Sequence, residues 1–201
     1  MNGTTGVMWR RLKNLLSPQL DIYTHLAERV ENKSVLEVGF GTGVGSLQLS
    51  RLAYSVDACE VDPDAVKFAK QLFSKGVVWF EHDITEDVAA RHDEGGMPLP
   101  PLRYDVIVCI ETLEHIPDYQ KALENINFYL RPNGVAYISG PNANADLRKT
   151  DLHEREFTAK EFREELHKVF STVELFDYSL TTRQGDNSTA TPLMAVCGKR
   201  G

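Results

Sequence analysis

This chain contains few cysteines, and their positions argue against both a zinc site and a disulfide-linked domain. The 201 residues include only three cysteines, Cys59, Cys109 and Cys197. Each lies in an apolar stretch, without the paired spacing of a zinc site or the density of a disulfide-linked secreted domain. We therefore expect three free, buried thiols and a reducing compartment, the cytoplasm.

The N-terminal sequence has no long apolar run, and basic residues do not predominate. The opening stretch MNGTTGVMWRRLKNLL reaches Trp9-Arg10-Arg11 too early for a signal peptide or a membrane span. The 22 Lys and Arg residues are outnumbered by 29 Asp and Glu, a net charge of −7. This balance argues against binding nucleic acid mainly through bulk charge, although an acidic chain can still carry a local basic groove. A small-molecule or protein substrate is favoured.

The sequence instead alternates strand and helix patterns. Its length and composition predict one domain over 1–201, with residues 1–33 as a helical preface. The expected strands are 34–38, 55–60, 77–81, 105–110, 135–139, 173–180 and 193–197. The expected helices are 43–52, 63–73 and 118–130, with a further helix opening at the capping-box pattern of Thr158. Together they predict an α/β fold, a Rossmann-like, doubly wound, mostly parallel seven-stranded sheet with a terminal antiparallel hairpin.

Ligands of such a sheet bind beyond the carboxyl ends of its strands, so the residues that follow each strand matter most. Gly39, Gly41, Gly43 and Gly45 follow the first strand, where the backbone must come close to a ligand. Glu60 ends the second strand, at the spacing of a carboxylate that binds ribose hydroxyls. A nucleoside is implied. Neither reading frame of these glycines fits the G-x-G-x-x-G pattern of a dinucleotide dehydrogenase.

The pattern Glu37-x-Gly39-x-Gly41-x-Gly43 resembles motif I of the class I S-adenosylmethionine-dependent methyltransferases. The resemblance covers about residues 34–198, and the terminal hairpin suits it, because the sheet of that family typically ends in an inserted antiparallel strand. It implies S-adenosylmethionine as cofactor and S-adenosylhomocysteine as product.

The resemblance also implies a set of cofactor contacts. In that family the glycine turn passes beneath the amino-acid part of the cofactor, and the preceding acid, here Glu37, helps to hold the charged methionine group. Glu60 would bind the ribose, and Asp83 would bind the adenine amino group beside the backbone amide of Ile84. The implied cofactor-binding residues are Glu37, Gly39, Phe40, Gly41, Gly43, Glu60, Val61, Asp83, Ile84 and Ile110.

The segment CIETLEHIPD, after the fourth strand, resembles two branches of this superfamily, the O-methyltransferases of ubiquinone biosynthesis and the terminal small-RNA 2′-O-methyltransferases. Both carry E-x-x-E-H here, matching Glu111, Glu114 and His115, and place a further histidine beyond the fifth strand, a position that His153 fits. Two carboxylates and two imidazoles suit a divalent metal such as Mg, Mn or Zn, which would orient substrate oxygens. Alternatively, the glutamates cap a helix, pair with a basic residue or stay solvated.

Methyl transfer needs little beyond geometry and the removal of a proton from the nucleophile. His115 is the expected general base and His153 the second candidate, because neutral imidazole is present at pH 7; either could instead be a histidine with only a local hydrogen bond. The segment after the fourth strand carries no Pro-Pro-Tyr signature of amide methylation, so oxygen is the favoured acceptor.

The sequence therefore predicts a methyltransferase that acts on a hydroxyl of a small molecule. An RNA terminus is disfavoured because this compact, acidic chain leaves no room for RNA-binding modules. Arg148, Lys149 and Arg155 keep that alternative open, although acidic neighbours make this loop a mixed-charge surface. A non-catalytic regulatory subunit that binds S-adenosylmethionine is the alternative from another class.

Overall fold

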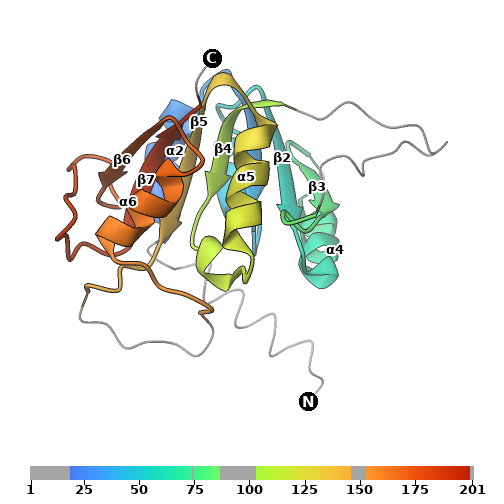
Figure 1. Ribbon diagram of the computed structural model, residues 1–201. Coiled ribbons are helices and arrows are strands. Elements are labelled where there is room, and N and C mark those ends of the chain that lie inside the picture. Colours follow the sequence, from blue (N-terminus) through green and yellow to red (C-terminus); the bar gives the residue numbers. More distant parts are fainter. Residues whose placement is uncertain (1–18, 74, 87–102, 146–152, 200–201) are drawn as a thin grey trace.

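The computed structural model describes residues 19–73, 75–86, 103–145 and 153–199. Its strands form one seven-stranded sheet of order β3-β2-β1-β4-β5-β7-β6 (Figure 1). Among the described strands, β7 alone runs antiparallel, between β5 and β6. The strands are β1 (Ser34–Val38), β2 (Ser55–Glu60), β3 (Val78–Glu81), β4 (Tyr104–Cys109), β5 (Leu130–Gly140), β6 (Thr172–Phe176) and β7 (Leu193–Gly198). The predicted sheet and its antiparallel end are confirmed.

Helices cover both faces of this sheet (Figure 1). The helical elements are α2 (Gln19–Arg29), α3 (Val44–Leu49), α4 (Pro63–Leu72), the short 3₁₀ turn η2 (Leu113–His115), α5 (Tyr119–Tyr129) and α6 (Ala159–His167). Leu123 of α5 and Phe162 of α6 join one apolar core on the sheet, and Leu26 of α2 and Leu49 of α3 join another on its opposite face. None of the helices in the described ranges is long and apolar enough to cross a membrane.

Local sequence signals set several helix starts where they were predicted. The Asp62 side chain accepts a hydrogen bond from the backbone N of Asp64 and caps α4, with Pro63 in its first turn. Thr158 and Glu161 form both bonds of the capping box that opens α6. Of the predicted helical preface, residues 19–29 form α2, and residues 1–18 lie outside the described residues.

Strand β5 begins earlier than the prediction of residue 135. Leu130 already pairs with Tyr104, and the register then shifts before Val106 pairs with Val135. Asn133 takes up the irregularity with a left-handed φ of 61°, a conformation that asparagine tolerates. The Asn-Gly signal was therefore correct about a local distortion and wrong about the start of the strand.

Strand β6 is shorter than predicted, ending at Phe176 instead of residue 180. Asp177 explains the end, because its Oδ1 accepts hydrogen bonds from the backbone N of Thr181 and Thr182 and from the Ser179 hydroxyl. A carboxylate that satisfies several successive donors favours a turn over continued pairing. The prediction of free thiols is confirmed, since all three cysteines are unpaired and buried.

Candidate functional site

A cleft of about 670 Å³ lies beyond the carboxyl ends of β1, β2, β3 and β4. This is the edge at which an α/β sheet of this type binds ligands. The sequence-predicted site residues that line it are Gly39, Gly41, Glu60, Val61, Asp83, Ile84, Glu111 and His115. Residues from four separate strand ends thus meet in one cavity.

The glycine turn after β1 forms one wall of the cleft. Gly39 has a φ of +73° and Gly43 a φ of +82°, both in the left-handed region that favours glycine. A Cβ on Gly43 would lie 2.8 Å from the Trp79 ring, so this glycine also permits close packing under the turn. The turn is therefore fixed both by its backbone conformation and by the residues packed against it.

Glu60 joins the glycine turn to the end of β2. Its Oε2 accepts a hydrogen bond from the backbone N of Gly41 at 3.0 Å, and its Oε1 accepts one from the backbone N of Val61 at 2.9 Å. Oε1 also accepts a long bond of 3.4 Å from the backbone N of Asp62. Oε2 can therefore accept one ligand hydroxyl directly, and a second hydroxyl can replace the long bond at Oε1. Val61 exposes 61% of its surface beside this carboxylate and offers an apolar surface within the cleft.

Asp83 and Ile84 line the cleft beyond β3. Asp83 Oδ1 accepts bonds from the backbone N of Thr85 at 2.8 Å and from the Thr85 hydroxyl at 2.7 Å, and neither bond involves Oδ2. The carbonyl of Ile84 accepts a 2.8 Å bond from the buried Asn125 side chain of α5. Hydrogen bonds from Thr85 and from Asn125 of α5 thus fix the orientation of this segment.

Glu37 lies apart from these residues and does not line the cleft. Its fully buried carboxyl accepts 2.5 Å hydrogen bonds from the Tyr23 hydroxyl of α2 and the Ser46 hydroxyl of α3. Burial raises the pKa of Glu37 from 4.5 to about 7, although both hydroxyls act to lower it. A direct contact with a ligand in the cleft would require the side chain to leave these partners.

Three other residues of the implied cofactor set also do not line the cleft. Phe40 is buried against Trp79, with ring centroids 4.9 Å apart. Gly43 packs on the same Trp79 ring, as described above, and Ile110 is buried in the core that contains α2. These residues support the glycine turn and the end of β4 through packing in the core instead of lining the cleft.

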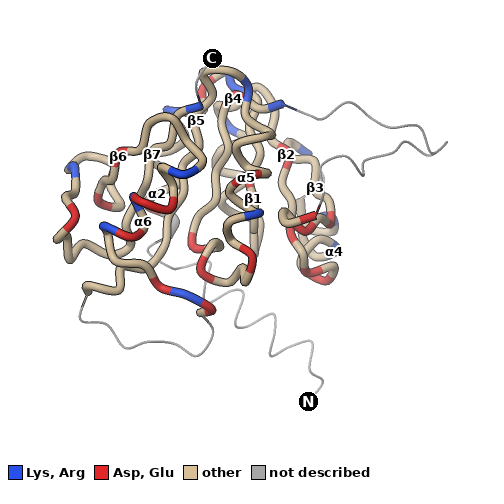
Figure 2. The backbone as a smooth tube through the Cα atoms, viewed as in Figure 1, with Lys and Arg blue, Asp and Glu red and all other residues tan. Residues whose placement is uncertain are grey.

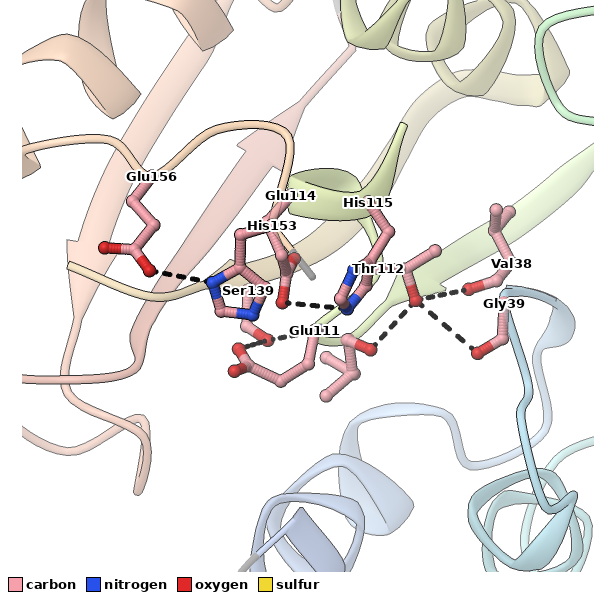
Figure 3. Close-up of polar contacts among 10 residues, drawn as sticks. Val38, Gly39, Glu111, Thr112, Glu114, His115, Ser139, His153 and Glu156 are labelled. Carbon is pink, nitrogen blue, oxygen red and sulfur yellow. Dashed lines mark hydrogen bonds and ion pairs between the residues drawn. The ribbon is translucent and has the colours of Figure 1, made fainter. Parts of the chain in front are cut away.

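Glu111 stands where β4 ends, and Ser139 of β5 holds it there. The backbone N of Glu111 donates to the Ser139 hydroxyl, and that hydroxyl donates to Glu111 Oε1 at 2.8 Å (Figure 3). Glu111 has a φ of +49°, an uncommon conformation for a residue with a side chain. Burial and the nearby Glu114 raise its pKa to about 7.

Glu114, His115 and His153 form a second cluster at the rim (Figure 3). Each offers a ligand atom, and these atoms lie within 4.8 Å of one another. Glu114 is only 2% exposed, and its Oε2 has no hydrogen-bond partner among the described residues. His153 Nδ1 lies 2.8 Å from Glu156 Oε1, which leaves Nε2 available. Glu111, predicted as a fourth ligand, is not part of this cluster.

The cleft carries negative charge. Its lining includes Glu60, Asp83, Glu111 and Asp118 and no lysine or arginine among the described residues. Figure 2 shows mostly acidic positions at the lower edge of the sheet below α5, β1 and α4, and several basic positions at the upper end. Such a cleft favours ligands that carry positive charge and disfavours polyanions.

Sequence reasoning missed three hydroxyl residues of this site. Thr112 and Thr85 line the cleft, and the buried Ser139 holds Glu111. Thr112 lies within the E-x-x-E-H segment, and this position was the only feature of the sequence that pointed to it. Ser139 had none, because its role depends on β5 lying beside β4.

The sheet order, the inserted antiparallel β7 and the glycine turn over a carboxylate-lined cleft define the fold of class I methyltransferases. A family model described as a methyltransferase domain matches residues 8–181. The chain belongs to this methyltransferase family. The resemblance inferred from the sequence is confirmed.

Curated relatives carry consistent names. The chain is 30% identical over 125 residues to a ubiquinone biosynthesis O-methyltransferase of Klebsiella pneumoniae, covering 60% of this chain and 48% of the relative. It is 28% identical over 159 residues to a probable S-adenosylmethionine-dependent methyltransferase of Mycolicibacterium smegmatis, covering 76% of this chain and 57% of the relative. The chain thus spans about half the length of the curated relatives it matches.

Solved structures share the fold. A TehB-like S-adenosylmethionine-dependent methyltransferase of Corynebacterium glutamicum superposes with a TM-score of 0.69 at 19% identity, covering 98% of this chain and 97% of that one. The N-methyltransferase NodS of Bradyrhizobium japonicum, in complex with S-adenosylhomocysteine, gives 0.64 at 18% identity, with 91% and 86% coverage. At these identities the likeness concerns the fold.

Proposed function

We propose that this chain transfers the methyl group of S-adenosylmethionine to a hydroxyl oxygen of a small molecule and releases S-adenosylhomocysteine. The observation that carries this proposal is Glu60, whose carboxylate lies in the cleft between the backbone N atoms of Gly41 and Val61. The names of relatives such as the Klebsiella ubiquinone biosynthesis O-methyltransferase support oxygen as the acceptor.

In this proposal the cofactor lies across the ends of β1, β2 and β3. Glu60 accepts hydrogen bonds from the ribose hydroxyls, Val61 packs against the base, and Asp83 accepts a bond from its amino group. The sulfonium charge of the cofactor suits a cleft lined by carboxylates. Because Glu37 is bonded to Tyr23 and Ser46, it supports the methionine end through the glycine turn rather than by contact.

The rim residues fit a divalent metal. Buried Glu114 Oε2 lacks a partner among the described residues, and two imidazoles lie within reach of the same point. Glu114, His115 and His153 would hold the ion, with Glu111 beside them, and a bound ion would orient the acceptor and lower the pKa of its hydroxyl. Burial raises the pKa of Glu114 from 4.5 to about 7, and a nearby cation would oppose that rise.

The reaction itself is an in-line displacement. The S–CH₃ bond breaks with its electron pair going to sulfur, an O–CH₃ bond forms, and the hydroxyl proton must leave. His115 lines the cleft with its side chain 46% exposed, so without a bound ion its imidazole can take this proton. His153, oriented by Glu156, is the second candidate for the same role. With an ion bound to both histidines, the lowered pKa of the coordinated hydroxyl would take the place of a histidine base, because a coordinated nitrogen cannot accept a proton.

The first experiment tests the cofactor half by calorimetric titration with S-adenosylhomocysteine. We expect Glu60→Ala to weaken binding by at least about tenfold, the loss of more than one charge-assisted hydrogen bond. Glu81→Ala, at an exposed carboxylate of β3, is the matched control and should bind like the unaltered chain. Failure of the unaltered chain to bind would refute the proposal.

The second experiment tests the acceptor. Methyl-tritiated S-adenosylmethionine is offered with catechols, phenols and aliphatic alcohols, and separately with a short RNA, each with Mg²⁺ or Mn²⁺. Label in a small hydroxyl compound supports the proposal. Label in the RNA alone would favour the 2′-O-methyltransferase alternative, and binding without transfer to any acceptor would favour a regulatory subunit.

A further inference from the structure

The glycine turn follows β1, and the Glu111–His115 segment follows β4. These two strands are neighbours in the sheet, but their backbone pairing ends before the cleft. The parallel ladder between β1 and β4 ends with the pair Glu37 and Val108. The glycine turn continues from β1 beyond this point, and the E-T-L-E-H segment continues from β4. Something other than the ladder must therefore set the separation of the glycine turn from the rim.

Thr112 lies between these two segments (Figure 3). Its Oγ1 is 3.0 Å from the Ile110 carbonyl oxygen and 3.5 Å from the carbonyl oxygens of both Val38 and Gly39. The hydroxyl has one proton to donate, and the 3.0 Å distance assigns it to Ile110, while 3.5 Å is a contact with the glycine turn rather than a full hydrogen bond. One side chain thus contacts backbone oxygens at the ends of both β1 and β4.

The methyl group of Thr112 packs against Gly39 of the glycine turn. A Cβ on Gly39 would lie 2.3 Å from Thr112 Cγ2 and 2.4 Å from Oγ1, so the threonine occupies the space that glycine leaves open. Gly39 therefore has two reasons to be glycine, its φ of +73° and this contact. Thr112 also lines the cleft between Gly39 and His115.

We propose that Thr112 is a positioning residue for methyl transfer: its hydroxyl anchors the side chain to the Ile110 carbonyl, and the anchored side chain packs on Gly39 and keeps the cofactor turn in register with the Glu111–His115 rim. The inference rests on the proposed function, because it assigns the turn to the cofactor. Transfer requires the donor and the proton acceptor to keep a fixed separation, and small displacements reduce the rate strongly. Thr112 touches the backbone of both halves and needs no contact with the reacting atoms.

The test compares Thr112→Val with Thr112→Ser. Valine keeps the shape and removes the hydroxyl, whereas serine keeps the hydroxyl and removes the methyl group. For S-adenosylhomocysteine we expect Thr112→Val to raise the calorimetric Kd about three- to tenfold, which is the range of one hydrogen bond. Thr112→Ser should stay within about twofold of the unaltered chain. Hydrogen exchange should be faster over residues 39–43 in Thr112→Val and unchanged over α6.

Several outcomes would overturn the inference. One is a Kd for Thr112→Val equal to that of the unaltered chain, and another is equal weakening by serine and valine. A third is weakening that comes with a matching fall in the Tm of the ligand-free chain, which indicates a purely structural role. Failure of the unaltered chain to bind S-adenosylhomocysteine would refute the proposed function instead, so the two failures are distinguishable.

Discussion

Glu114 has a buried carboxyl whose hydrogen bonding is incomplete. Its carboxyl is 2% exposed, and Oε2 has no hydrogen-bond partner among the described residues. The backbone carbonyl of Glu114, in contrast, accepts bonds from the backbone N of Glu154 and Arg155. A buried carboxylate oxygen without a donor is costly, and a cation is the natural group to compensate for it.

We therefore expect Glu114→Gln to weaken Mn²⁺ binding by at least about tenfold, because a charged ligand becomes neutral. Calorimetric titration with Mn²⁺ measures this, with the exposed Glu154→Gln as control. The Tm of the metal-free chain should not fall, since a neutral amide is easier to bury than a carboxylate. Equal Mn²⁺ affinity in both variants would contradict a metal centre at this rim.

For single residues, the sequence predicted positions at strand ends better than it predicted side-chain contacts. Glu60 and Asp83 line the cleft at the expected strand ends, because Glu60 ends β2 and Asp83 follows β3 by two residues, and both strands are visible in the local pattern. Glu37 satisfies the same motif, yet its carboxyl is bonded to Tyr23 and Ser46. A motif gives the position of a residue along the strand, while the direction of its side chain depends on what packs there.

At the scale of elements, helix α2 is held to the sheet through the Glu37 carboxyl. The Tyr23 hydroxyl donates to Glu37 Oε1, and the Tyr23 ring packs on Gly45, where a Cβ would lie 2.3 Å from the ring. Ser46 of α3 donates to the other oxygen. One carboxyl therefore ties α2 and α3 to β1 behind the glycine turn.

Tyr23→Phe removes one of these two donors and keeps the ring. We expect the free energy of unfolding to fall by about 1–3 kcal/mol, because a buried carboxyl oxygen loses its partner. Hydrogen exchange should rise over α2 and the first residues of α3. The exposed Tyr54→Phe, at a side chain with 83% exposure, is the control. Unchanged exchange over α2 would show that packing alone holds the helix.

Element boundaries were predicted best where a cap is local and worst where pairing is distant. Asp62 and Thr158 predict the starts of α4 and α6 from sequence within a few residues, and both caps form as expected. The start of β5 at Leu130 depends on Tyr104, which lies on another strand. Such pairing is a tertiary effect that no short window of sequence contains.

At the scale of the whole molecule, two buried carboxyls and one half-buried carboxyl make stability depend on pH. Glu37, Glu111 and Glu114 each have a pKa raised from 4.5 to about 7, with desolvation by burial as the first cause in each. A folded-state pKa above the unfolded value means that the fold favours the protonated form. This stabilisation is complete below pH 4.5 and is lost as the pH rises through 7.

We therefore expect the ligand-free chain to lose unfolding free energy between pH 5 and 8, as measured by urea denaturation. Glu37→Gln should reduce that loss by roughly 2–3 kcal/mol, the free energy that corresponds to its pKa difference. The exposed Glu81→Gln should leave the profile unchanged. Equal slopes in all three chains would show that Glu37 titrates alike in the folded and unfolded states.

The two binding halves of the molecule stand on different strand ends at one edge of the sheet. Glu60 ends β2 and Asp83 follows β3, whereas Glu114 and His115 follow β4 and His153 precedes α6. Each half is built from its own strand ends on a rigid sheet, so removing a metal from the rim should leave the cofactor half formed. We expect the coupling between metal and S-adenosylhomocysteine to stay below about 0.4 kcal/mol, a change in Kd of less than about twofold.

Calorimetric titration of S-adenosylhomocysteine in Mg²⁺ and again in excess EDTA measures this coupling directly. The Kd should agree between the two buffers, while methyl transfer to any acceptor found should fall in EDTA because the ion orients that acceptor. By reciprocity, saturating S-adenosylhomocysteine should leave Mn²⁺ affinity unchanged. A Kd that weakens tenfold in EDTA would show that the ion contacts the cofactor, and the rim would then belong to the cofactor site rather than to the acceptor.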